Sequence, residues 1–184
     1  TWLAVTAISS PAIIGVDPTT LAHVTQHKNR LWFAQAATLK AWYMPIDSVG
    51  GTAAVLDLSA IAKYGGFIQA IDTWTLDAGD GVDDYWVAVT SEGEVIVYQG
   101  TDPAASSTWQ IKGVWKLGSP IGRRCTLKVA GDLLIITRDG VVPLSKALIS
   151  SRVQPRVAIT DKIQQAMSDA VTLYGGNFGW QMVP

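Results

Sequence analysis

Short apolar runs alternate with turn-forming residues through the middle of the chain, a pattern that is typical of antiparallel β-hairpins. Three pairs of runs are separated by only a few residues, at 31–36 and 41–44, at 85–90 and 95–98, and at 133–137 and 141–144. The second and third turns contain Glu92-Gly93 and Asp139-Gly140. An acidic residue followed by glycine favours a tight turn in which both central residues have positive φ. The pattern therefore predicts three hairpins.

A further strand is predicted between the second and third hairpins, because residues 109–117 alternate in polarity. With a period of two, one face of this strand carries the apolar side chains Trp109, Ile111, Trp115 and Leu117. Residues 126–129 alternate more weakly and predict another strand. The chain before residue 21 is expected to be irregular or strand-like.

The pattern changes after residue 148 and indicates a helix over 160–171. Apolar side chains recur there with the spacing of a single helical stripe, at Ile163, Ala166, Met167, Ala170 and Val171. We expect this stripe to pack on the sheets. Thr160 is predicted to cap the helix N-terminus, with Asp161 near the positive end of the helix dipole.

The spacing of the hairpins indicates a repeating sheet unit. The turn centres lie near residues 37, 93 and 140, and four-stranded propeller blades repeat about every 40–50 residues. We expect an all-β fold of antiparallel four-stranded sheets, β-propeller-like, with one C-terminal helix; a β-sandwich is the alternative. Residues 22–148 supply fewer than three such periods, whereas propellers have about 4–8 blades, so the propeller would be incomplete.

The predicted organisation is a unit of blades over 1–148, followed over 149–184 by a connector, the helix and the start of a further strand. The chain closes with apolar residues around Trp180 and without a charge after Asp169. Soluble chains usually end in polar residues, so we expect the 184 residues to be a fragment of a longer protein, the alternative being one complete domain with trimmed ends.

Composition narrows the class of protein. Apolar residues make up 48% and charged residues 16%, with a net charge of −1, which excludes a disordered tail and a histone-like basic protein. The charge is unevenly divided: residues 1–111 hold 4 Lys or Arg against 11 Asp or Glu, and residues 112–184 hold 10 against 4. Such opposite halves could complement each other within the chain or between subunits. The single cysteine, Cys125, excludes an internal disulfide.

Few residues carry recognisable chemistry. Four carboxylates, Asp77, Asp80, Asp83 and Asp84, flank two glycines and make a weak candidate calcium site. The EF-hand spacing is absent, and a solvated loop is the favoured interpretation. His23 and His27 lack a third metal ligand. Phosphate-binding loops and a G-x-S-x-G motif are missing from the sequence. We therefore predict no catalytic residues and no required cofactor.

Two weak binding features are left. Trp74 and Trp109 are candidate exposed platforms on which a sugar could stack. Arg123 and Arg124, with nearby lysines, make a basic cluster suited to a subunit contact or to phosphate groups. These features support an alternative function as a carbohydrate- or protein-binding β module.

Several segments of the chain carry a family resemblance. Residues 27–33 read HKNRLWF and precede a hairpin, and together with 84–100, 131–141 and 176–180 they resemble β-propeller-like structural proteins of tailed bacteriophages and prophages, of the tail-nozzle or packaged-DNA-stabilising type. The resemblance implies a non-enzymatic virion component, made in the bacterial cytoplasm and assembled in the phage particle. Its implied partners are other copies of itself and neighbouring phage structural proteins, with DNA passing nearby.

Overall fold

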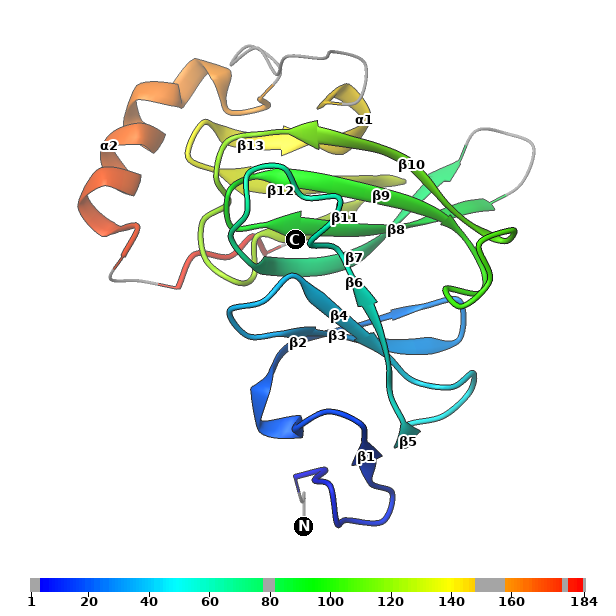
Figure 1. Cartoon of the computed structure of the whole chain (residues 1–184). Helices are drawn as coiled ribbons and strands as arrows, with labels where there is room; N and C mark the ends of the chain where they lie inside the picture. Colours follow the sequence, from blue (N-terminus) through cyan, green and yellow to red (C-terminus); the bar gives the residue numbers. More distant parts are fainter. Residues whose placement is uncertain (1–3, 78–81, 148–157, 177–178, 184) are drawn as a thin grey trace.

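The computed structural model describes residues 4–77, 82–147, 158–176 and 179–183, without the side chains of residues 76, 77, 82 and 83. These residues form mainly β-strands, in three antiparallel sheets (Figure 1). No helix in the described part of the chain is long and apolar enough to cross a membrane.

The strands of each sheet follow one another in chain order. The first sheet contains β2 (Leu21–His27), β3 (Arg30–Gln35), β4 (Lys40–Tyr43) and β6 (Ala54–Asp57). The second contains β7 (Ile68–Asp77), β8 (Val82–Thr90), β9 (Glu94–Gly100) and β10 (Trp109–Lys116). The third contains β11 (Thr126–Val129), β12 (Asp132–Thr137) and β13 (Gly140–Pro143). A short parallel pair, β1 (Ile13–Ile14) and β5 (Gly51–Thr52), lies beside the first sheet.

All three predicted hairpins are confirmed, as β3–β4, β8–β9 and β12–β13. The expected geometry of two turns was wrong, however. Gly93 and Gly140 have positive φ, at 84° and 116°, but Glu92 and Asp139 do not. In the first of these turns the Gly93 N–H donates to the Thr90 carbonyl at 2.9 Å. Of the acidic-Gly pair, only the glycine has positive φ, which it adopts without the steric cost of a Cβ.

The second sheet is buried on both faces. Alternate residues of β8 and β9, including Trp86 and Ile96, pack against Trp32 of the first sheet. The intervening residues, including Val87 and Val95, pack against the third sheet. This explains why the apolar runs of β8 and β9 are continuous rather than alternating. A two-sheet β-sandwich does not fit, because three sheets pack in series with the second in the middle.

The two outer faces of this series are covered differently. On the third sheet, Leu134 and Ile136 are covered by Met167 and Val171 of α2 (Gln164–Tyr174) and by the segment around Trp180. Figure 1 shows α2 beside the third sheet and away from the first. On the first sheet, the N-terminal segment covers only part of the outer face, through residues 13 and 16.

Strand β10 departs from the predicted alternation. Its register against β9 shifts between Ile111 and Gly113, which marks a β-bulge. The bulge reverses the faces: Trp109 and Val114 pack with the first sheet, whereas Trp115 and Leu117 pack with the third. Ile111 is left 45% exposed, so the prediction that these apolar residues share one face was wrong.

The C-terminal helix is confirmed, but its details differ from those expected. A short 3-10 turn at Asp161–Ile163 precedes α2, and Thr160 makes no cap; its hydroxyl instead accepts the Val141 N–H at 3.1 Å. Only part of the predicted stripe faces the sheet, since Ile163 and Ala166 are exposed. A four-residue helix, α1 (Leu144–Ala147), follows β13 directly. Of the connector predicted after residue 148, residues 149–157 lie outside the described residues.

The predicted fold class is confirmed as mainly antiparallel β with a C-terminal helix. The third sheet has three strands among the described residues rather than four.

Candidate functional site

The two tryptophans expected to be exposed platforms are buried. Trp109 is 7% exposed and lies stacked between Trp32 and Tyr98, with ring centroids 5.5 and 5.3 Å away. Trp74 is 5% exposed and packs against Tyr85. Both predictions were wrong because the neighbouring sheets cover these side chains, which the pattern of one strand could not show. Their rings are part of the core and are unavailable to a sugar.

The structure describes only part of the acidic segment, residues 77–84. Asp80 and the side chains of Asp77 and Asp83 lie outside the described residues, while Asp84 is half-buried. The Asp84 carboxylate accepts hydrogen bonds from the Thr75 hydroxyl at 2.7 Å and from the Lys28 ammonium at 3.3 Å. Burial alone would raise the pKa of Asp84, but these two donors outweigh it and hold the pKa below its usual value. Asp84 thus has local partners already.

No group of three or more metal-ligating side chains occurs among residues 4–77, 82–147, 158–176 and 179–183, setting aside those side chains that the structure does not describe. The calcium site therefore stays a prediction for the part of the acidic segment that is not described.

The basic residues do not form one cluster. Arg123 and Arg124 are exposed, and the Arg124 guanidinium donates to the Gln181 side-chain oxygen at 2.8 Å. Lys128 forms an ion pair with Asp72 at 2.8 Å. Lys116 lies over the Tyr64 ring, 4.7 Å from its centroid, on another part of the surface. Lys116 therefore does not belong to the predicted cluster.

The two histidines lie on β2 and have structural partners. His27 is 2% exposed, and its Nδ1 lies 3.2 Å from the Thr73 hydroxyl. Because the Thr73 hydroxyl donates to the Gln26 carbonyl, its oxygen accepts the proton of His27 Nδ1. The Nδ1 of His23 accepts the Ile71 N–H at 3.4 Å. These contacts hold β2 against β7, the edge strand of the second sheet.

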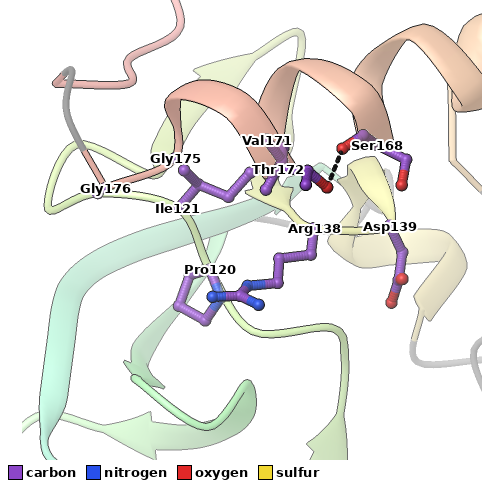
Figure 2. A pocket seen from close by; sticks show the side chains of 10 residues that line it. Pro120, Ile121, Arg138, Asp139, Ser168, Val171, Thr172, Gly175 and Gly176 are labelled. Carbon is purple, nitrogen blue, oxygen red and sulfur yellow. Dashed lines mark hydrogen bonds between the residues drawn. The ribbon is translucent and has the colours of Figure 1, made fainter.

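A polar groove of about 550 Å³ lies between α2 and the loops at residues 120–122 and 138–139. Figure 2 shows the Arg138 side chain extending below α2 toward Pro120, with the Asp139 carboxylate pointing away from the guanidinium. Ser168 and Thr172 lie above it on α2, and the Thr172 hydroxyl donates to the Ser168 carbonyl. The polar side chains of this groove are exposed and do not converge on one point, so it offers no assembled catalytic group.

The outer face of the first sheet carries an extended apolar feature. Strand pairing brings Val24, Phe33, Trp42 and Val55 side by side across β2, β3, β4 and β6. We call these four residues the apolar row. Val24 and Val55 at its ends are 57% and 45% exposed, and Phe33 and Trp42 between them are half-buried. Side chains directly opposite each other on one face of a sheet are in contact, so the row is continuous.

Sequence reasoning did not single out this row. Trp42 stands in an apolar run, a pattern that favours a core position. The available signal was that residues 31–34 and 41–44 are apolar on both strand faces, which indicates a sheet covered on both sides. The inner face, with Trp32 and Tyr43, meets the second sheet. Of the described residues outside the sheet, those of the N-terminal segment pack on the outer face.

A groove of about 630 Å³ lies next to the row. It is lined by Val24 and Phe33 of the row, by Ile13 of the N-terminal segment, and by Arg123 and Arg124. The predicted basic pair, Arg123 and Arg124, therefore lies at the edge of the apolar outer face. An apolar surface with a polar rim is typical of protein–protein interfaces.

Comparison with known protein families found no family that matches the chain, and comparison with curated proteins found no match either.

Proposed function

We propose that this chain is a non-enzymatic structural protein of a tailed phage or prophage particle. It is part of the tail or connector, and it works through contacts with other copies of itself and with neighbouring particle proteins. The role requires no catalytic group and no cofactor.

The observation that carries this proposal is the incompletely covered outer face of the first sheet. In the same chain, both faces of the second sheet and the outer face of the third are covered. The apolar row is the exception, with two valines about half exposed at its ends. Exposed apolar patches of this kind mark surfaces that are covered by a partner.

The sheets themselves fit the proposed family. In this proposal they are consecutive blades of an incomplete propeller. Each sheet is a meander, and β7, which begins the second sheet, contacts β2 of the first sheet and β11 and β12 of the third. In a propeller, blades surround a central channel, so strands of neighbouring blades lie together near that axis. The similarity of residues 27–33, 84–100 and 131–141 to phage proteins supports the same assignment.

The proposal is tested by following the protein into particles. A tagged copy of the natural protein is expressed in the native host, phage particles are purified by density gradient, and the tag is detected in the particle fraction. We expect the protein to co-purify at a constant ratio to the other tail proteins, and deletion of its gene to stop assembly of infectious particles. Its absence from intact, infectious particles would refute the proposal.

A tail or connector position would place the chain near the DNA path. Arg123 and Arg124 are exposed and carry the charge needed to face phosphate groups there. The carbohydrate-binding alternative has lost its structural support, because Trp74 and Trp109 are both buried.

A further inference from the structure

Exposed large apolar side chains concentrate on two separate segments of the described chain. The first segment, residues 5–55, contains seven of them: Val5, Ile8, Ile14, Val24, Ile46, Val49 and Val55. The second, residues 159–183, contains five: Ile159, Ile163, Leu173, Tyr174 and Val183. Only three others are described between these segments: Tyr64, Ile111 and Val129.

Helix α2 has a second apolar side besides the one that packs on the third sheet. Met167 and Val171 face the sheet, whereas Ala166, Ala170 and Leu173 follow at i, i+4 and i+7 along a neighbouring stripe. Ala166 and Leu173 on this stripe are exposed, with Leu173 at 64%. Ile163, in the 3-10 turn that precedes α2, extends this stripe by one turn and is 56% exposed. We call these four residues the outer stripe of α2.

The apolar row and the outer stripe match in length. The row crosses four neighbouring strands, and three spacings of about 4.8 Å make it about 14 Å long. Helix α2 has 11 residues, which at 1.5 Å per residue makes it about 16 Å long. A helix stripe packed on a sheet face is a stable arrangement, and α2 already packs in this way on the third sheet.

The two surfaces also have opposite charges beside them. Arg123 and Arg124 line the groove next to the row, whereas the helical segment that carries the stripe holds Asp161 and Asp169 against one basic residue, Lys162. Contact between row and stripe brings the arginines toward the acidic residues, whereas contact between two rows brings two pairs of arginines together. Complementary charge favours the first arrangement.

We propose that the apolar row of one copy of this chain binds the outer stripe of α2 of a second copy, in a head-to-tail contact. This inference rests on the proposed function as an assembling particle protein, for which it names the surfaces that meet. Row and stripe lie on different parts of the molecule, the row at the open end of the series of sheets and the stripe beyond the third sheet (Figure 1). Each copy can therefore bind two others, and the contact can repeat.

Cross-linking tests the contact directly. The only native cysteine, Cys125, is fully buried. A cross-linker therefore reaches the thiols introduced on the surface and not Cys125. Val55→Cys and Leu173→Cys are prepared as separate proteins, mixed, and treated with a short thiol-reactive cross-linker. We expect a covalent dimer in the mixture and little dimer from either protein alone. A mixture of Ile111→Cys with Leu173→Cys is the matched control, because Ile111 is also 45% exposed but lies on β10.

Two results would overturn the inference. Efficient dimer formation by Val55→Cys alone would show that two rows meet. Equal yields from the Val55 and Ile111 mixtures would show that the row has no preferred contact with the stripe.

A second measurement is the concentration dependence of association by analytical ultracentrifugation. Val55→Glu and Leu173→Glu should each weaken self-association about tenfold or more, because an unpaired charge enters an apolar contact. Val129→Glu, at a site 41% exposed on β11, should leave it unchanged. Equal effects of all three variants, or none, would contradict the contact. If the row and stripe variants associate normally while the protein is still found in particles, this inference fails and the proposed function stands.

Discussion

Lowering the pH should destabilise the folded protein, because His27 is buried in its neutral form. Its ring is buried between β2 and β7, donates from Nδ1 to the Thr73 hydroxyl, and lies edge-on to Trp109. Burial lowers the pKa of His27 to about 4, with the nearby positive charges of Lys28 and Lys128 adding to the effect. Asp84 and the Gly100 backbone act in the opposite direction without compensating for it.

The direction and the size of this change in stability follow from the lowered pKa of His27. The unfolded chain binds a proton at His27 below its ordinary pKa of 6.5, whereas the folded chain resists protonation until the pH approaches 4. Stability is therefore fully present above about pH 6.5 and falls as the pH is lowered through the interval between these two values. Each tenfold difference in proton affinity between the folded and unfolded chains corresponds to about 1.4 kcal/mol, so His27 should account for a loss of about 3 kcal/mol.

The assay compares the wild-type protein with His27→Asn by urea unfolding at several pH values between about 7.5 and 4.5. Asparagine retains an N–H donor for Thr73 but does not titrate. We expect the variant to be less stable near neutral pH, since the ring leaves a cavity, and the difference to shrink by most of 3 kcal/mol toward pH 4.5. His23→Asn separates the contribution of the other histidine, whose pKa burial also lowers. A constant difference between wild type and His27→Asn would refute the reasoning.

Three further substitutions test the packing by chemical denaturation. Trp109→Ala should cost about 3–5 kcal/mol, because the ring fills the space between two sheets; a loss below about 1 kcal/mol would mean that it is exposed. Glu94→Ala should cost about 2 kcal/mol, since the buried carboxylate accepts two backbone N–H groups, and an unchanged stability would contradict those bonds. Gly100→Ala should cost more than about 2 kcal/mol, because φ is 140° and a Cβ would overlap the Thr108 carbonyl oxygen. Gly65→Ala, at φ 70° in open space, should cost about 1 kcal/mol, and equal losses at the two glycines would rule out the overlap.

The hairpins were predictable because their signals are local. An acidic-Gly pair such as Glu92-Gly93 disfavours extended backbone and favours a turn, and the apolar runs on either side then pair with each other. The helix was predictable for the same reason, from a stripe of apolar residues such as Met167 and Val171. These interactions join residues close in the chain, so a single sequence contains them.

The surfaces were not predictable in this way. Whether Trp109 is a platform or a core residue depends on Tyr98 of the neighbouring strand β9 and on Trp32 of the first sheet. The bulge in β10 places Trp115 on the face opposite Trp109 without any change in the alternation of the sequence. Local pairing of neighbouring segments was determined by the sequence alone. Which side of each strand is buried, and which row stays open, was decided only by the stacking of the sheets, because burial depends on contacts between residues far apart in the chain.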